Sequence, residues 1–129
     1  SRNQTIAMVN VRVYPQMDIY QHEVVQLTDS QISEFDDELK QNITKGVASS
    51  GARVTTWYGT EKIRVRNKIF LLSKYRRTSA IQTNTYFRVR LMRLLHGKHS
   101  FTLTLSYNET EEYLLRPIIE YMMKTVSIR

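Results

Sequence analysis

The chain has 129 residues, no cysteine, and 19 basic against 12 acidic side chains, giving a net charge of +7. This length suits one domain, and a hydrophobic content of 41% is that of an ordinary globular protein rather than a disordered chain. Without cysteine, disulfides, thiol catalysis and thiolate metal sites are excluded, and no apolar run approaches the length of a membrane span. We therefore expect a single globular domain over residues 1–129.

The positive charge is concentrated in one part of the chain. Residues 51–107 hold 12 of the 19 basic side chains and 1 of the 12 acidic ones, Glu61. The segments before and after this region each carry a small net negative charge. Such segregation indicates that the predicted sheet presents a basic surface.

The first strand is predicted over Thr5 to Val13, where alanine and valine occupy every second position. Tyr14-Pro15 ends or bends this strand, because proline cannot donate to a strand ladder. Met17 to Leu27 is ambiguous and includes enough β-branched residues for a short second strand.

A helix is predicted to start after Thr28, which has Gln31 at capping-box spacing. The apolar residues that follow recur at helical spacing and form one stripe: Ile32, Phe35, Leu39 and Ile43. Gly46 is the predicted stop.

The basic region is predicted to form consecutive strands. They are predicted at Arg53–Tyr58, Lys62–Arg66 and Lys68–Arg77, with turns at Gly59-Thr60 and near Asn67. A polar connection, Thr78 to Thr85, follows.

Tyr86 to Tyr107 is predicted to be a hairpin that reverses at His96-Gly97-Lys98-His99. A two-residue loop would set Leu105 opposite Arg90 and Tyr107 opposite Arg88, mixing charge into an apolar face. A loop of odd length, or a bulge, sets Leu105 opposite Leu91 and Tyr107 opposite Val89. Because a one-residue slip exchanges the faces, we predict the odd loop or bulge, with Arg93 near the sheet end.

The last element is predicted to be a helix capped by Asn108 with Glu111 at box spacing. Pro117 kinks this helix or marks its first turn. Its apolar stripe is Leu115, Ile118, Ile119, Met122 and Val126. The acidic residues of both helices read as solvated faces. The order of elements predicts an α+β fold, with an antiparallel sheet of about five to seven strands packed against two main helices.

No catalytic or metal-binding pattern emerges. His96 and His99 flank a turn while His22 is distant, and a zinc site needs three or four convergent ligands. Glu61 reads as a salt-bridge partner rather than an acid catalyst, and no nucleophile motif or phosphate-binding glycine loop is present. We therefore expect no enzyme activity, cofactor or metal. We interpret His96 and His99 as exposed turn residues.

A basic sheet face with interleaved tyrosines is the remaining candidate site. Its predicted partner-binding residues are Arg64, Arg66, Lys68, Tyr86, Arg88 and Arg90. The same composition fits single-stranded nucleic acid, an anionic membrane surface or an acidic protein, or a face that only solvates the protein. We interpret three further residues as part of the core, or as the lining of a small apolar cleft between helix and sheet: Met122, Met123 and Tyr107.

The second half of the chain, FRVRLMRLLHGKHSFTLTLSYNETEEYLLRPIIEYMMKTVSI, resembles the closing portion of PsbP-like domains. The matching features are the turn at Gly97, the strand Phe101 to Tyr107, the acidic run Glu109 to Glu112, Pro117 in the helix, and the closing Ser127-Ile128. The preceding strand, helix and strands follow the same order.

This resemblance implies an α/β/α sandwich that binds protein partners without catalysis. Known members include the extrinsic photosystem II subunit, a Ran-binding nuclear import factor, bacterial envelope lipoproteins and adaptor chaperones of secretion effectors. We therefore expect an accessory or protein-interaction domain at a bacterial cell envelope or in the periplasm, with a cytoplasmic location as the alternative. The partner is an unidentified protein, and a homodimer through a sheet edge is a further possibility. The alternative function is binding of nucleic acid or an anionic membrane through the basic sheet face.

Overall fold

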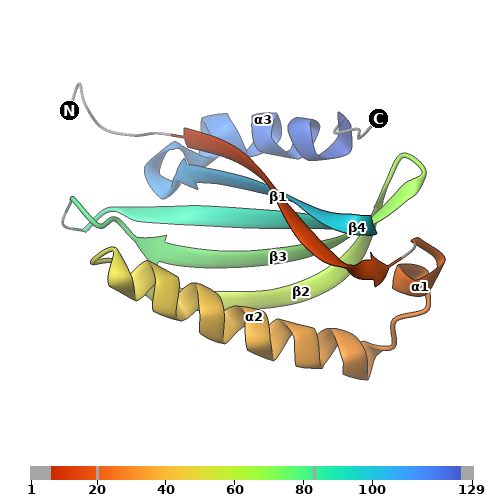
Figure 1. Cartoon of the computed structure of the whole chain (residues 1–129). Coiled ribbons are helices and arrows are strands. Elements are labelled where there is room, and N and C mark those ends of the chain that lie inside the picture. The colour runs from red at the N-terminus through yellow and green to blue at the C-terminus, as the bar shows by residue number, and fades with distance from the viewer. Residues whose placement is uncertain (1–6, 20, 83, 126–129) are drawn as a thin grey trace.

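A twisted antiparallel sheet forms the middle layer of the molecule, in the strand order β1–β4–β3–β2 (Figure 1). The computed structural model describes residues 7–19, 21–82 and 84–125, with only the backbone described for 14–19, 21–22 and 96–98. The elements are β1 (Ala7–Ile19), α1 (Gln21–Val25), α2 (Asp29–Ser49), β2 (Val54–Val65), β3 (Lys68–Thr78), β4 (Tyr86–Asn108), the 3-10 helix η1 (Glu109–Glu111) and α3 (Glu112–Thr125). Helices α2 and α3 lie on opposite sides of the sheet (Figure 1). The predicted α+β class is confirmed.

Strand β4 doubles back on itself, so the sheet has five adjacent rows. Its first half, Tyr86 to Arg93, pairs with β3, whereas its second half, Gly97 to Tyr107, pairs with β1. Figure 1 shows the two halves side by side, meeting near the sheet end at which β1 finishes. The predicted hairpin is therefore present, and the row count lies at the low end of the predicted range.

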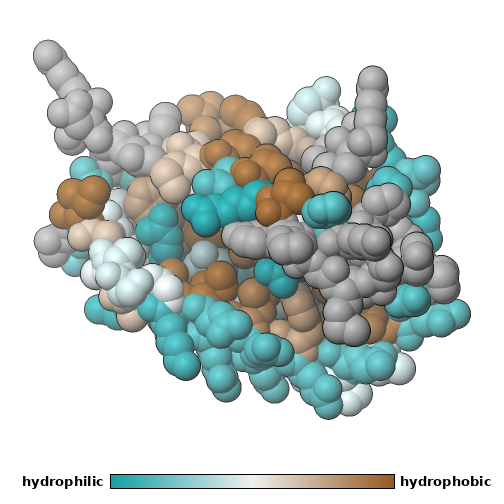
Figure 2. Space-filling view, in the orientation of Figure 1, coloured by the Kyte–Doolittle hydropathy of each residue, from teal (hydrophilic) through white to brown (hydrophobic). Residues whose placement is uncertain are grey.

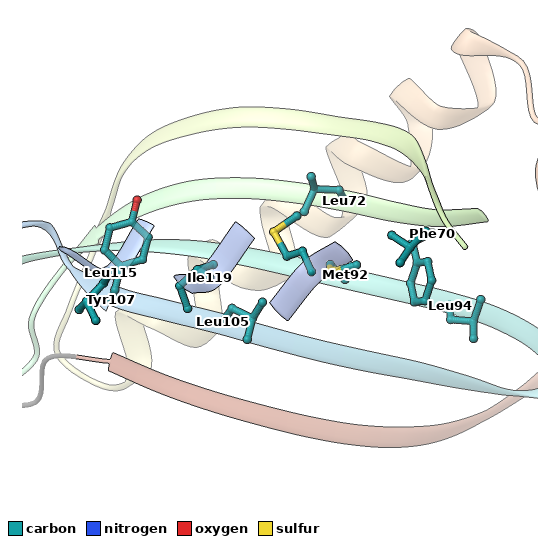
Figure 3. Close-up of a cluster of buried hydrophobic side chains, with 10 residues drawn as sticks. Phe70, Leu72, Met92, Leu94, Leu105, Tyr107, Leu115 and Ile119 are labelled. Atoms are coloured by element: carbon teal, nitrogen blue, oxygen red, sulfur yellow. The ribbon is translucent and has the colours of Figure 1, made fainter. Parts of the chain in front are cut away.

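The predicted register of this hairpin is wrong. Leu105 and Tyr107 belong to the same buried cluster as Met92 and Leu94, beneath α3 (Figure 3). Even-numbered residues of the first half therefore share a face with odd-numbered residues of the second half, the parity that an even loop gives. Leu91, predicted opposite Leu105, points to the other side.

This parity also places Arg88 and Arg90 on the α3 side, in the arrangement that the prediction rejected as mixing charge into an apolar face. The mixture is tolerated because α3 supplies carboxylates to both arginines, Glu112 to Arg88 and Glu120 to Arg90. The register is thus set by the helix that covers the face, not by the hairpin's own pattern.

The opposite face packs against α2 through an aromatic and polar cluster. Trp57 stacks on Tyr75 with ring centroids 5.5 Å apart, and its Nε1 donates a hydrogen bond of 2.9 Å to Asp36 of α2. Arg93, predicted near the sheet end, places its guanidinium 5.4 Å from the ring centroid of Phe35. These contacts fix α2 across the sheet from α3.

Helix α2 begins as predicted and ends later than predicted. The capping box is confirmed: the Gln31 amide donates to Thr28 Oγ1 at 3.2 Å, and the Thr28 amide donates to Gln31 Oε1 at 2.9 Å. Gly46 does not stop the helix, because glycine inside a helix costs only about 1 kcal/mol relative to alanine. The helix runs to Ser49, and the positive φ that follows its end falls at Gly51 (+91°).

The predicted turn at Gly59-Thr60 is also wrong, because β2 is continuous. The register shifts between Trp57 and Gly59, and Gly59 has a φ of +104°, so the glycine forms a bulge inside one strand. The tight turn near Asn67 is confirmed, since Val65 pairs with Lys68 across it.

The early segment forms a longer strand than predicted. Strand β1 continues past Pro15 to Ile19 with a register irregularity, and α1 follows, so the short strand suggested within Met17 to Leu27 is wrong. Thr5 lies outside the described residues.

The final helix contains Pro117 in its interior and is preceded by η1, whose cap Asn108 accepts a hydrogen bond of 3.0 Å from the Thr110 amide. The buried positions of α3 are Leu115, Ile119 and Met123, whereas Ile118, predicted to be buried, is half exposed. Val126 lies outside the described residues. Within the described chain, neither α3 nor any other helix has the length and apolar character needed to cross a membrane.

Candidate functional site

The described residues contain no group of three or more histidine, aspartate or glutamate side chains able to hold a metal ion. His99 is exposed, and the side chains of His22 and His96 lie outside the described residues.

The six predicted partner-binding residues do not form one site. Arg64 pairs with Ile69 on the α2 side of the sheet, while Arg66 lies in the β2–β3 turn and Lys68 at the start of β3. Tyr86 pairs with Thr78 at the opposite end of β3. The structure therefore separates the β2–β3 end from Tyr86, Arg88 and Arg90.

Arg88 and Arg90 instead belong to a square of four cations on the α3 side. Arg88 lies directly opposite Arg76, and Arg90 directly opposite Lys74. Like charges directly opposite in an antiparallel pair are unfavourable unless they are compensated. Each pair is therefore stable only if nearby carboxylates offset the repulsion between its two cations.

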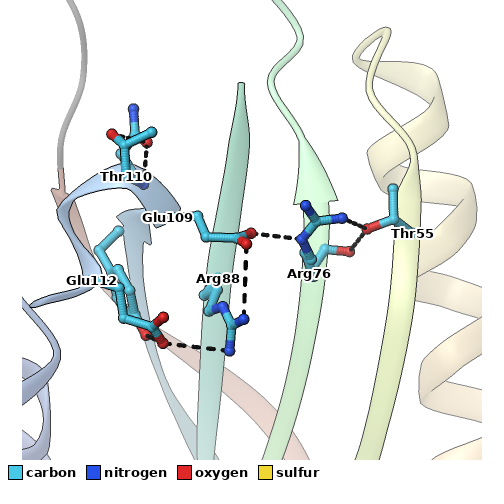
Figure 4. A network of polar contacts seen from close by, with 8 residues as sticks. Thr55, Arg76, Arg88, Glu109, Thr110 and Glu112 are labelled. Atoms are coloured by element: carbon cyan, nitrogen blue, oxygen red, sulfur yellow. Dashed lines mark hydrogen bonds and ion pairs between the residues drawn. The ribbon is translucent and has the colours of Figure 1, made fainter. Parts of the chain in front are cut away.

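Glu109 compensates the first pair by bridging it (Figure 4). Its carboxylate lies 2.6 Å from Arg76 Nε and 3.8 Å from Arg88 Nη2, and Glu112 adds a contact of 3.4 Å to Arg88. Arg76 also lies 3.8 Å above the Tyr86 ring centroid. This pair and its tyrosine therefore tie the start of the C-terminal helical segment to the sheet.

In the second pair, α3 compensates Arg90 alone. The Arg90 side chain is 11% exposed, and its Nη2 lies 3.4 Å from Glu120, which also accepts a hydrogen bond of 3.1 Å from Arg116. The bond from Arg116, with a further contribution from Arg90, lowers the pKa of the Glu120 carboxyl. Glu109, Glu112 and Glu120 were predicted to be solvated, and this prediction is wrong. The i, i+4, i+8 spacing of Glu112, Arg116 and Glu120 was the sequence signal that these charges share one flank of the helix.

Tyr107 extends this network into the core. Its hydroxyl donates a hydrogen bond of 3.1 Å to Glu112 Oε1. Burial, followed by the nearby Glu112 charge, raises the pKa of the tyrosine. The sheet cations, Tyr107 and the acidic flank of α3 thus form one structural unit.

A cleft of about 470 Å³ opens between this acidic flank and strands β2 and β3. Its floor includes Leu72, Lys74, Arg88, Arg90 and Tyr107, and its walls come from α3 and from the bulged part of β2. The cleft is more polar than the apolar helix–sheet cleft suggested by the sequence.

The other flank of α3 borders an exposed apolar surface, which we call the β1–α3 surface. Its members are large apolar residues with half or more of their area exposed: Val9, Val11, Val13, Leu114, Ile118 and Tyr121. Figure 2 shows hydrophobic colour over α3 and along β1.

The two parts of this surface lie on the same side of the sheet. Val9 pairs with Leu105 and Val11 with Leu103, so these valines share the face that α3 covers. With 100° between successive helical residues, Ile118 projects from the flank opposite Glu120. Because Glu120 reaches toward Arg90, in the row next to β3, Ile118 faces the β1 side.

Strand β1 is an edge strand of the sheet, and no described strand pairs with its outer side. An unpaired edge presents free backbone donors and acceptors, and soluble proteins usually protect it with charges, prolines or covering elements. Here the face beside that edge carries three exposed valines.

Comparison with known proteins gives no relative from which function can be transferred: no family model, curated protein or solved structure matches this chain.

Proposed function

We propose that this protein is a non-catalytic interaction domain that binds an extended segment of a partner protein at the β1–α3 surface. The observation that carries the proposal is the exposure of Val9, Val11 and Val13, between 51% and 62%, along an edge strand. Contiguous exposed apolar surface on a soluble domain typically marks a binding site.

The geometry favours strand addition as the binding mode. A partner segment in extended conformation satisfies the outer backbone groups of β1 by hydrogen bonding. Its alternate side chains then fall on the α3 side of the sheet, beside the valines and next to Ile118 and Tyr121. The preferred segment therefore has apolar residues at every second position.

The alternative function, binding of nucleic acid or an anionic membrane, has less support. Two of the cations predicted to carry it, Arg88 and Arg90, each contact a glutamate at 3.4 Å, and their neighbour Arg76 contacts Glu109 at 2.6 Å. Charges neutralised within the protein release few counterions from a polyanion. Among the residues predicted for this function, Arg64 and Arg66 are exposed at the β2–β3 end, with the half-buried Lys68 beside them.

The resemblance to PsbP-like domains supports the same class of function. The three-layer arrangement, the closing hairpin and the proline inside α3 are features that the resemblance leads one to expect. We propose the PsbP-like architecture on these grounds, together with its non-catalytic, partner-binding role.

The test is site-specific photo-crosslinking in the source cells. A photoreactive phenylalanine analogue replaces Val11 in one variant and Ile81 in a control variant. Ile81 is 93% exposed in the connection between β3 and β4, so it matches Val11 in hydrophobicity but not in location. We expect a discrete adduct from position 11 that mass spectrometry maps to an apolar-alternating segment of one protein.

Equal adducts from both positions, or none from position 11, would contradict the proposal. An adduct of this chain with itself would identify the partner as a second copy pairing through β1.

A further inference from the structure

The square of sheet cations is compensated unevenly. In the Arg76–Arg88 pair, one carboxylate, Glu109, lies within ion-pair distance of both cations. In the Lys74–Arg90 pair, Glu120 reaches Arg90, whereas the Lys74 side chain has no hydrogen bond or ion pair to any described residue. Lys74 is therefore an uncompensated cation directly opposite a second, nearly buried one.

The carboxylates of α3 and η1 that contact the sheet cations are already engaged. Glu109 is shared by Arg76 and Arg88, while Glu120 is shared by Arg90 and Arg116. Across the network, four guanidinium groups meet three carboxylates before Lys74 is counted. Glu61, on the cleft wall, is exposed and makes no ion pair with a described cation.

Space is available beside the uncompensated Lys74. Lys74 and Arg90 both line the cleft of about 470 Å³, and Gly59, the residue opposite Lys74 on β2, has no side chain to fill it. A Cβ atom built at Gly59 would meet no atom of a non-neighbouring residue within 4 Å. Leu72 and Tyr58 add apolar lining, and clefts of this size accept small organic ligands.

We propose that the cleft binds a small organic anion whose carboxylate or phosphate group lies between Lys74 and Arg90. The anion then neutralises Lys74 and Arg90, as Glu109 neutralises Arg76 and Arg88. The organic part of the ligand packs against Leu72 and Tyr58. This site is separate from the β1–α3 surface and does not depend on the function proposed for it.

The test is a titration of the isotope-labelled protein followed by amide NMR. The probes are phenyl phosphate, benzoate, inorganic phosphate and the neutral benzyl alcohol. We expect saturable shifts at the Gly59, Glu61 and Lys74 amides with phenyl phosphate or benzoate and none with benzyl alcohol. The tighter of the two organic anions identifies the preferred group, and added salt should weaken it.

The variant Lys74→Met should weaken binding by about tenfold or more, since it removes one charged partner of the anion. Lys68→Met, on the same strand but outside the cleft, is the matched control and should retain wild-type affinity. The NMR spectrum itself reports whether each variant is folded.

Three results would overturn the proposal: no saturable shift at millimolar probe, unchanged affinity in Lys74→Met, or shifts centred on Arg64, Arg66 and Lys68. Inorganic phosphate binding as tightly as phenyl phosphate would overturn the organic part of the assignment.

Discussion

The two flanks of α3 lie over the same sheet but differ in how their side chains are paired and covered. On one flank, Glu112 and Glu120 reach down to Arg88 and Arg90, so the charged groups are largely satisfied inside the protein. On the other flank, Leu114 and Ile118 project beside β1 and are half exposed or more. The charged flank fixes the helix to the sheet, and the apolar flank is the part that we propose binds a partner.

This contrast reverses the simple expectation that charge marks a binding surface and apolar residues mark the core. Cations that already have carboxylate partners release few counterions from a polyanion. Covering exposed apolar area, in contrast, lowers the free energy of the complex.

Removing one apolar side chain from the covered part of the face should have the largest effect. Leu105 has 0% exposed area and pairs directly with Val9, which is 51% exposed. Leu105→Ala should lower the free energy of unfolding by about 2–5 kcal/mol. Val9→Ala should cost less than about 1 kcal/mol, because its side chain is not enclosed. Urea denaturation of both variants measures the difference, and similar losses would show that β1 is covered in solution.

Charge placed on the apolar flank should affect binding rather than folding. Ile118→Glu should weaken binding of the crosslinked partner segment by about thirtyfold, the effect of losing a hot-spot residue. Ile81→Glu is the control and should bind normally. Isothermal titration calorimetry gives the affinities, and a normal affinity for Ile118→Glu would remove α3 from the interface.

Loss of the bridging carboxylate should have a smaller effect, confined to stability. Glu109→Gln leaves Arg76 and Arg88 opposite each other without their shared carboxylate, at a cost of about 1 kcal/mol. Glu34→Gln, on the exposed surface of α2, is the control. The loss should shrink in high salt, and partner affinity should not change. A fall in partner affinity would show that the cation network takes part in binding.

The smallest effect concerns Tyr107 at alkaline pH. Its pKa is raised in the folded protein, so its contribution to stability is fully present below the ordinary tyrosine pKa of 10.0. That contribution is lost as pH rises from this value through the folded-state pKa, because the unfolded chain ionises first. Wild-type stability should therefore fall relative to Tyr107→Phe over this range. Parallel pH profiles for the two proteins would contradict the raised pKa.

Local features were predictable from the sequence. The Thr28–Gln31 capping box and the turn at Asn67 depend on a few neighbouring residues, and both are present. Gly59 was identified as a special backbone position but misread as a turn, since a glycine with positive φ serves a bulge equally well.

The features that failed depend on distant elements. The hairpin parity could not be chosen correctly without knowing that α3 brings Glu112 and Glu120 to Arg88 and Arg90. The same missing information made these arginines look like a binding surface. The exposure of Ile118 was missed because helical periodicity gives the width of an apolar stripe but not how much of it the sheet covers.

The central claim is that the outer edge of β1, beside α3, receives the partner. Hydrogen exchange of the backbone amides, with and without the crosslinked partner segment, tests it most directly. Strand addition predicts that exchange slows along Met8 to Val13, while the amides of α2 and of the cleft residue Gly59 keep their rates. Protection centred on the cleft or on α2, with β1 unchanged, would contradict the account.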